Sequence, residues 1–278
     1  MENDVRGDFG SMRYNPLQIF KASKTPAGLY ARQKWLDEAG TVQWQNDFHE
    51  TLHLLMSGQS DNGSWNQSPL ESVRRLFGLH LTLRNKTLEI EKALDWLMGQ
   101  TLNHNVANLT APLELVSNDD FPGMPFMPGQ TNVSLVCMTL FLATVFQKSN
   151  ETKVLAHYHL LSLWVSENTG IMDKELDKMN ALRALVVHPD YAKDSATIAL
   201  VDNLGNIQDS SGCWPTPIPF FRTVNALAHL HLEQAERQWE KALAFLCSEQ
   251  NRDGSWGSED HEWNTFLVVH ALKNKGCL

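Results

Sequence analysis

A zinc-hydrolase spacing occurs early in the chain, where His49-Glu50-Thr51-Leu52-His53 has the pattern HExxH. On a helix this spacing puts two imidazoles on one face, where they can bind Zn²⁺, with the Glu beside them as a general base. Glu71, 18 residues after His53, would be the third ligand. The pattern is short, and no strands precede it that would align a peptide. An outer helix surface carrying two His and one Glu is therefore the simpler interpretation, and a zinc hydrolase is a remote alternative.

A neighbouring pair of carboxyl groups, Asp119 and Asp120, is a second candidate for chemistry. One carboxylic acid can protonate a substrate when an adjacent carboxylate and hydrogen bonds hold its proton. The pair lies in the segment 115–130, whose three Pro and two Gly forbid a regular helix. Asp119 and Asp120 are thus candidate catalytic acids, and the alternative is that they are loop and capping residues.

The composition describes a globular protein with many aromatic residues. Of 278 residues 42% are hydrophobic, and 9 are Trp and 12 are Phe, which predicts a packed core or an aromatic-lined pocket. The formal net charge of -9 has the wrong sign for tracking a phosphate backbone. Nucleic acid is therefore not an expected partner.

The cysteines and the N-terminal residues favour a cytoplasmic protein. Cys137, Cys213, Cys247 and Cys277 form no CxxC pair, so neither a disulfide framework nor a zinc finger is indicated. The first residues are polar and acidic and do not resemble a secretory signal. The longest apolar stretch, 133–146, is too short to cross a bilayer, although contact with a membrane surface stays open. No cofactor or metal is expected.

One pattern recurs along the chain. The segments 59–65, 208–214 and 250–256 all read Gln, three residues, Gly, one residue, Trp, and the last two start 42 residues apart. The segment 92–100 looks like a decayed copy, ending 41 residues after Gln59. Gly can take the positive φ that ends a helix, and apolar residues at helical spacing flank the copies. Each unit is therefore predicted to be helix, turn, helix.

The rest of the chain is also predicted to be helical. Apolar residues recur at helical spacing in the segments 17–38, 42–56, 70–83, 88–98, 131–146, 154–165, 174–187, 191–204, 223–232 and 235–246. No convincing alternating strand is found. The sequence therefore predicts an all-α fold of roughly a dozen helices in one domain, 1–278, with residues 1–15 as a disordered tail. The apolar loops 115–130 and 214–221 precede strong helices and should lie at one end of the molecule.

These units resemble the repeat of the squalene and oxidosqualene cyclases and, more loosely, of protein prenyltransferase β subunits. The last copy matches the whole family pattern, with Lys241-Ala242 and Phe245-Leu246 preceding Gln250. The resemblance implies an α/α toroid, in which two rings of helices surround a tapered apolar cavity. It also implies a structural role for the repeat residues, the Gln bonding to helix-end backbone and the Trp packing over the turn: Gln59, Gly63, Trp65, Gln208, Gly212, Trp214, Gln250, Gly254 and Trp256.

The sequence departs from the catalytic motifs of the families it resembles. It has no DxDD, the cyclase motif whose middle Asp protonates the substrate. The segment that comes nearest to this motif is Ser117-Asn118-Asp119-Asp120. In the zinc site of the prenyltransferases, the Cys position matches Cys213, but the Asp and His positions fall on Ser211 and Asn264. The DDxxD cluster of the class I terpene synthases is also absent. Catalysis is thus left undecided.

Other groups near the expected inner-helix starts could line the cavity, and aromatic side chains there can stabilise cations through their ring faces. They are Glu71, Arg74, Phe126, Asn132, Phe220, Phe221, Arg222, His261, Trp263 and Asn264. The sequence therefore predicts a protein that binds an apolar, isoprenoid-like molecule, either as a divergent cyclase-like or prenyltransferase-like enzyme or without chemistry. A scaffold for protein contacts with the same fold is a further alternative, since fold alone does not fix function.

Overall fold

The computed structural model describes residues 12–103, 109, 111, 123–129, 131–168 and 174–278, and every regular element within them is a helix. The α-helices are α1 (Pro26–Lys34), α2 (Val42–Met56), α3 (Pro69–Thr82), α4 (Leu88–Thr101), α6 (Asn132–Val145), α7 (Thr152–Asn168), α8 (Glu175–Leu185), α9 (Ser195–Ile207), α10 (Phe220–Leu227), α11 (Glu233–Ser248) and α12 (His261–Asn274). Short 3₁₀ turns occur at Gln18–Phe20 (η1) and Tyr191–Lys193 (η4). The predicted all-α class is confirmed. None of the helices in these ranges is long and apolar enough to span a membrane.

Side-chain caps set several helix starts. Thr25 precedes Pro26, and its hydroxyl accepts a hydrogen bond from the Gly28 N–H at 2.9 Å, as a Ser or Thr cap does. This cap explains why the single helix predicted over 17–38 is wrong: the chain makes only the turn η1 and then restarts at Pro26. Pro lacks a backbone N–H and is tolerated in the first helical turn but not in a helix interior. Similarly, the helix predicted from Tyr191 begins only at Ser195, after η4.

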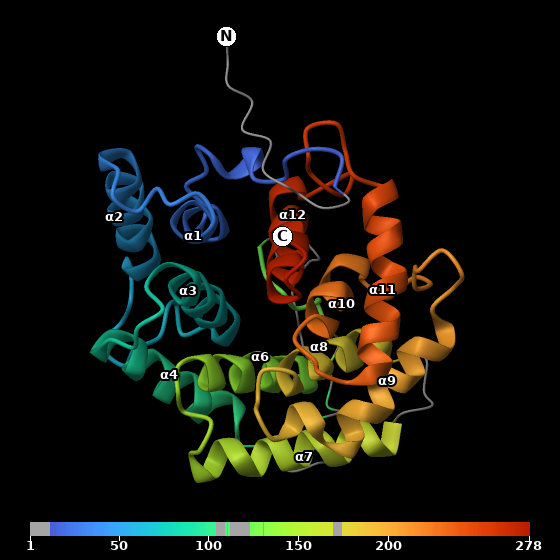
Figure 1. Ribbon diagram of the computed structural model, residues 1–278. Coiled ribbons are helices and arrows are strands. Elements are labelled where there is room, and N and C mark those ends of the chain that lie inside the picture. Colours follow the sequence, from blue (N-terminus) through green and yellow to red (C-terminus); the bar gives the residue numbers. More distant parts are fainter. Residues whose placement is uncertain (1–11, 104–108, 110, 112–122, 130, 169–173) are drawn as a thin grey trace.

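Six helices contact one another in a closed order. α1 contacts α3, α3 contacts α6, and α6, α8, α10 and α12 follow in succession, after which α12 contacts α1. These six are called the central helices below. α2, α4, α7, α9 and α11 lie outside them, as Figure 1 shows, and α2, α4 and α7 each contact two successive central helices. Central and peripheral helices therefore alternate along the described chain.

Burial differs between the two sets as amphipathic packing requires. In the peripheral helix α2 only Trp44, Asp47 and Thr51 are buried, which lie three and four residues apart on one face. The central helix α6 is buried over most of its length, from Val133 to Ala143. Helices that are apolar on all sides belong to a protein interior. The sequence pattern thus decides which helices are central.

The repeated glutamines connect successive peripheral helices. In the second copy, Gln208 Nε2 donates to the carbonyl of the turn's own glycine at 2.9 Å and to the Gln238 carbonyl in α11 at 3.0 Å. In the first copy, Gln59 Nε2 makes the same two bonds, to its glycine and to the Glu89 carbonyl in α4, both at 3.0 Å. Each distant carbonyl lies 30 residues further along the chain. The amide therefore satisfies two backbone acceptors at once.

The repeated tryptophans fill the turns. Trp65, Trp214 and Trp256 are 1%, 7% and 0% exposed. The indole Nε1 donates to the Leu204 carbonyl at 3.1 Å from Trp214 and to the Leu246 carbonyl at 2.8 Å from Trp256, in each case near the end of the preceding helix. A buried indole is favourable when its N–H finds such an acceptor.

The third copy binds the beginning of the chain. Gln250 Oε1 accepts from the backbone N–H groups of Arg13 and Tyr14 at 3.0 and 3.1 Å, and its Nε2 donates to the Tyr14 carbonyl at 2.9 Å. Residues 13 and 14, assigned to a tail from the sequence, are therefore held against the last turn. This contact joins the two ends of the described chain.

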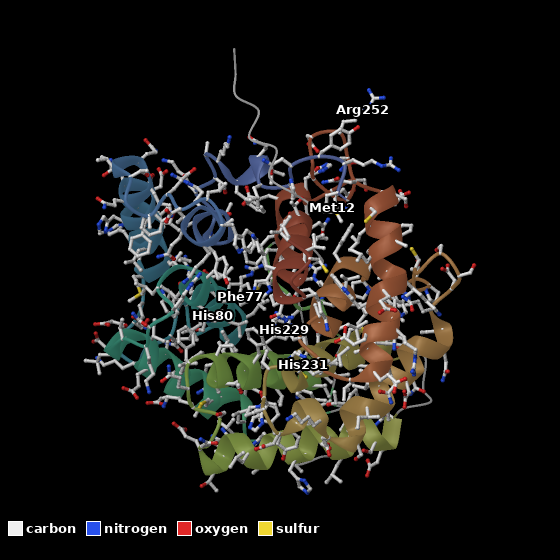
Figure 2. All side chains as sticks on the ribbon, viewed as in Figure 1. Met12, Phe77, His80, His229, His231 and Arg252 are labelled. Carbon is white, nitrogen blue, oxygen red and sulfur yellow. The ribbon has the colours of Figure 1, made fainter. Side chains whose placement is uncertain are left out.

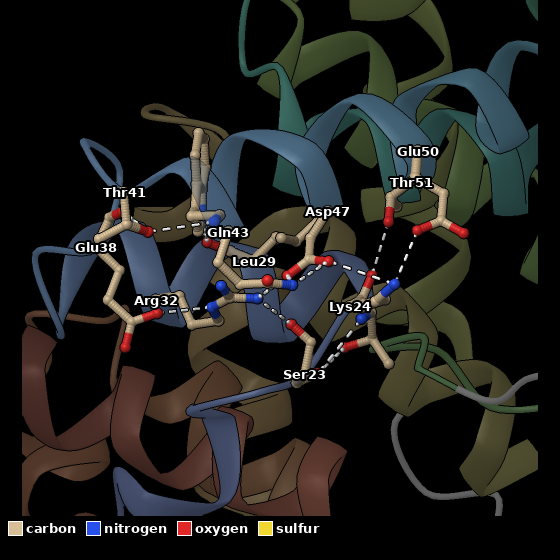
Figure 3. Close-up of polar contacts among 12 residues, drawn as sticks. Ser23, Lys24, Leu29, Arg32, Glu38, Thr41, Gln43, Asp47, Glu50 and Thr51 are labelled. Atoms are coloured by element: carbon tan, nitrogen blue, oxygen red, sulfur yellow. Dashed lines mark hydrogen bonds and ion pairs between the residues drawn. The ribbon is translucent and has the colours of Figure 1, made fainter.

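A buried ion pair fastens α2 to α1 (Figure 3). Arg32, only 2% exposed, donates from Nη1 to Asp47 Oδ2 at 2.8 Å and from Nε to Glu38 Oε2 at 2.7 Å. Gln43 Nε2 also donates to Asp47, and the Lys24 ammonium lies 3.3 Å from the same carboxylate. The hydrogen bond from Arg32 is the main reason that the pKa of Asp47 lies below its usual range.

Asp47→Asn should lower the free energy of unfolding by about 2 kcal/mol, because it removes the buried one of the two carboxylates that compensate the Arg32 guanidinium and leaves only Glu38. Urea denaturation followed by circular dichroism measures this loss. The matched control is Glu50→Gln, which removes the exposed partner of Lys24 and should change the midpoint little. Equal midpoints for the two variants would show that the pair contributes nothing specific.

Candidate functional site

Two cavities lie among the central helices. The first, of about 600 Å³, is lined by the starts of α1 and α12 and by α3 from Arg74 to Leu81, and is called the N-end cavity. Most of its wall is apolar: Pro26, Ala27, Leu55, Phe77, Gly78, Leu81, Met124 and Trp263. The polar wall residues are Thr25, Arg74, Asp260 and Glu262. Such a space has the size and the mixture of surfaces typical of small-molecule pockets.

The second cavity, of about 310 Å³, is lined largely by residues from the last turns of the central helices and is called the C-end cavity. Phe77, Leu81 and Trp263 line both cavities and separate them. The aromatic wall continues with Tyr30, Phe141 and Phe266, and its polar groups are His80, Arg84, Arg183, Asn225, His229 and His270. Figure 2 shows Phe77, His80 and His229 in the interior of the molecule.

Three of the four polar residues of the N-end cavity, Thr25, Arg74 and Glu262, already have partners. Glu262 Oε1 accepts a hydrogen bond from Ser23 Oγ at 2.9 Å and another from Thr25 Oγ1. Arg74 Nη1 lies 3.5 Å from Glu71 Oε2. The cavity therefore offers a ligand mainly apolar and aromatic contact.

The segment 123–129 covers one side of the N-end cavity and is anchored to three central helices. The Met124 carbonyl accepts from Trp263 Nε1 and from Arg222 Nε, both at 3.1 Å. The Asn180 amide binds the backbone of Met127: Oδ1 accepts from the Met127 N–H at 2.8 Å, and Nδ2 donates to the Met127 carbonyl at 3.0 Å. These side chains satisfy backbone groups that a Pro-rich segment cannot pair with itself.

Arg183 brings a positive charge into the C-end cavity. Its side chain comes from α8, and the residue is 8% exposed. Nη1 donates to Asn225 Oδ1 at 2.7 Å, the guanidinium carbon lies 5.3 Å from the centre of the Phe141 ring, and Nε has no hydrogen-bond partner among the described residues. Burial lowers the pKa of Arg183 to about 10, so the group is still charged at neutral pH.

Arg84 brings a second positive charge from the end of α3. Its backbone is left-handed, with φ 60°, which is uncommon for a residue other than Gly. The guanidinium carbon lies 4.0 Å from the centre of the Tyr30 ring, and neither Nε nor Nη2 has a partner in the described part of the chain. No acidic residue lines this cavity among the described residues, so the two charges are uncompensated there.

The histidines of the C-end cavity are neutral at neutral pH. Burial, reinforced by the nearby arginines, lowers the pKa of His80 and of His270 to about 4 and holds the pKa of His229 well below its usual range. His80 Nδ1 and His229 Nε2 are buried without a partner among the described residues. His270 Nδ1 lies 3.5 Å from Asn225 Nδ2.

Two of the cavity residues predicted from the sequence, Arg74 and Trp263, line the N-end cavity, and Trp263 also lines the C-end cavity. Phe126 is buried and packs its ring at right angles to Phe141, with centroids 5.3 Å apart. Glu71 accepts from Arg75 Nε at 2.8 Å in the first turn of α3.

The remaining predicted cavity residues lie around helix starts. Phe220 packs against Phe221 and, with centroids 5.7 Å apart, against Trp214. His261 Nδ1 lies 3.2 Å from Ser255 Oγ, and Asn264 Nδ2 donates to the Glu259 carbonyl at 2.8 Å. Asn132 opens α6, and Arg222, described above, holds the Met124 carbonyl.

Asp119 and Asp120 lie outside the described residues. A buried carboxyl group that the sequence did not single out is Asp177, in the first turn of α8. It accepts from Ser134 Oγ at 2.7 Å and from Thr131 Oγ1 at 2.8 Å, and burial raises its pKa. Asp177 lines neither cavity and joins α8 to the start of α6.

The two metal patterns lack further ligands. His49, Glu50 and His53 are exposed on the peripheral helix α2, and Glu50 pairs with Lys24 at 2.8 Å. Burial raises the pKa of the Cys213 thiol, which disfavours the thiolate that zinc binds. Within the described residues, no three His, Cys, Asp or Glu side chains are placed to hold a metal ion together.

Sequence reasoning missed the arginines and histidines of the C-end cavity. The available signal was a charged residue inside an apolar helical run, as in Leu182-Arg183-Ala184-Leu185, because Arg is rarely buried without a partner. The spacing of His80 and Arg84, four residues apart, was a second signal, since on a continuous helix it would place both on one face.

Comparison with known proteins adds information on the fold. No protein-family model matches the sequence, and no curated protein matches it. A crystal structure of a protein from Actinoplanes superimposes with a TM-score of 0.53, covering 92% of this chain and 90% of that chain, at 17% sequence identity. The chain is therefore similar to that protein in its overall helical fold.

Proposed function

We propose that the chain is an α/α toroid that binds an apolar, isoprenoid-like molecule in the N-end cavity. The observation that carries this proposal is the cavity itself, about 600 Å³ with a wall that includes Leu55, Phe77, Leu81 and Trp263. Ligand pockets of drug-sized molecules span about 300–1,000 Å³ and are mostly apolar with a few polar groups. The resemblance of the Gln-x-x-x-Gly-x-Trp turns to the cyclase repeat agrees with such a ligand.

The closed order of contacts among the central helices supports the toroid. In this interpretation the central helices form an inner ring, and the peripheral helices form an outer one. The bonds of Gln59 and Gln208 to the next peripheral helix fit successive units of one ring, and Gln250 closes it by holding Tyr14.

Binding without chemistry is proposed ahead of catalysis. The carboxyl groups among the described residues of the N-end cavity are Asp260 and Glu262, and Glu262 is already engaged by two hydroxyl groups. A divergent cyclase is the second candidate, because the Phe77 and Trp263 rings meet at 88° with centroids 5.9 Å apart and present π faces that suit a carbocation.

Ala27→Leu should reduce the affinity for farnesol roughly tenfold or more, because the added carbon atoms occupy the N-end cavity. Calorimetric titration of the purified protein with farnesol measures the affinity. Ala22→Leu, at an exposed position, is the matched control and should bind like the wild type. Farnesol binding that is absent in the wild type, or equal in all three proteins, would exclude the proposed site. Incubation with squalene tests the cyclase: product formed by the wild type would favour the second candidate.

A further inference from the structure

The C-end cavity has a charge that no protein group balances. Arg84 and Arg183 both line it, and the structure shows no ion pair for either among the described residues. Other buried cations of this chain do have carboxylate partners: Arg32 pairs with Asp47, and Lys178 pairs with Glu175 at 3.0 Å. Buried charges are normally paired because desolvation without a partner is unfavourable. An anion from outside the described part of the chain would therefore stabilise the two unpaired arginines.

The free donors of these arginines have the geometry of an oxyanion site. Nε and Nη2 of Arg84 lie on the same edge of the guanidinium, so that their N–H groups can bind two oxygens of one group side by side. Arg183 adds its free Nε–H, while Asn225 and the Phe141 ring hold its guanidinium in place. A site fixed in this way loses little freedom when the anion binds.

We infer that the C-end cavity binds a phosphate group, held by Arg84 and Arg183. A carboxylate carries one negative charge and two oxygens, whereas a phosphate monoester brings up to two charges and three free oxygens, which match two cations with three unpartnered donor nitrogens. The neutral His80 and His229 rings can add hydrogen bonds from their unpartnered nitrogens without adding charge.

The phosphate could come from either of two sources with the same chemistry. One is free inorganic phosphate. The other is the head group of an amphiphile whose apolar part lies against Phe77, Leu81 and Trp263, the residues that the two cavities share. The inference does not rest on the proposed function, since the anion site is defined by its own residues.

Calorimetric titration at pH 7.5 and constant ionic strength distinguishes these sources with three probes: inorganic phosphate, farnesyl monophosphate and farnesol. Arg183→Met and Arg84→Met each remove one guanidinium while keeping a long apolar side chain. The control is Arg252→Met, because Arg252 is exposed on the last turn, as Figure 2 shows. Arg84 is only half-buried, so its variant gives a second test that does not depend on a substitution in the interior.

Each cavity variant should weaken binding of a phosphate probe roughly tenfold to hundredfold, the usual effect of losing hydrogen bonds to a charged group, and Arg252→Met should not. Binding of inorganic phosphate supports a free anion, and binding of farnesyl monophosphate alone supports a head group. Without ligand, Arg183→Met should unfold at a temperature at or above that of the wild type, because it removes an unpaired buried charge.

The inference is overturned if neither phosphate probe binds the wild type, or if the arginine variants bind both as tightly as the wild type does. If farnesol and farnesyl monophosphate bind with equal affinity, and neither affinity changes in the arginine variants, the phosphate site is overturned and the proposed function still stands. If inorganic phosphate binds and farnesol does not, the phosphate site stands and the proposed function is overturned.

Discussion

Gly212→Ala should lower the free energy of unfolding by about 4 kcal/mol, a large value for one methyl group. Gly212 has φ 92°, and a Cβ atom built there would lie 2.3 Å from the carbonyl oxygen of Lys241 in α11. Both causes act together, since an L-residue is strained at this φ and the contacted atom is helix backbone that cannot rotate away. Urea denaturation measures the loss.

Gly58→Ala separates the two causes. Gly58 also has a positive φ, 76°, but nothing lies within 4 Å of the Cβ position. Only the backbone strain remains, so this variant should lose about 1 kcal/mol. The difference between the variants measures the close approach of the repeat turn to α11. Similar losses for both would mean that α11 shifts freely and that the turns do not fix the helix spacing.

The repeat turns could be predicted from the sequence because their chemistry is local. The four-residue separation of Gln208 and Gly212 is the length over which the Gln amide reaches the glycine carbonyl. The bond from Gln208 to Gln238, in contrast, crosses 30 residues, and its existence could be suggested only by resemblance to a family. The helices followed from apolar periodicity, and the failure over 17–38 came from giving too little weight to Pro26 and its Thr25 cap.

The sequence could mark single buried charges, but it could not predict that they meet in one cavity, because they come from helices far apart in the chain. Arg84 follows α3, Arg183 lies in α8, and His229 follows α10, so their meeting depends on how the central helices pack. Each residue alone resembles an ordinary helix-end cation, which helix dipoles favour. The polar residues expected at the N-terminal ends, such as Glu71 and His261, instead pair with neighbours on their own segments. The sequence therefore indicates which residues pair with close neighbours in the chain better than it indicates which residues line a cavity.

The charged and polar side chains of the C-end cavity lower the free energy of unfolding of the protein. Two unpaired guanidiniums and three neutral histidines are costly in a protein interior, where apolar side chains of the same size would pack at lower free energy. Tyr30, Phe141 and Phe266 nevertheless surround them. This opposition between stability and polarity is typical of binding sites, and the buried histidines make the cavity sensitive to acid.

Acidification from pH 7 to pH 5 should destabilise the fold by roughly 2 kcal/mol for each of His80 and His270. The unfolded chain binds a proton at each histidine near pH 6.5, whereas the folded chain does so only near pH 4. The unfolded state therefore binds more protons inside this window, and stability is lost as the pH falls through it. His80→Phe should remove about 2 kcal/mol of the total loss, since the ring still packs against Phe141 and Phe146 but cannot titrate. Urea denaturation at pH 7, 6 and 5 measures the free energy of unfolding for the wild type, for His80→Phe and for a control variant of the exposed His159. If the unfolding free energy falls equally with pH in all three proteins, then His80 takes up its proton in the folded state as readily as in the unfolded state.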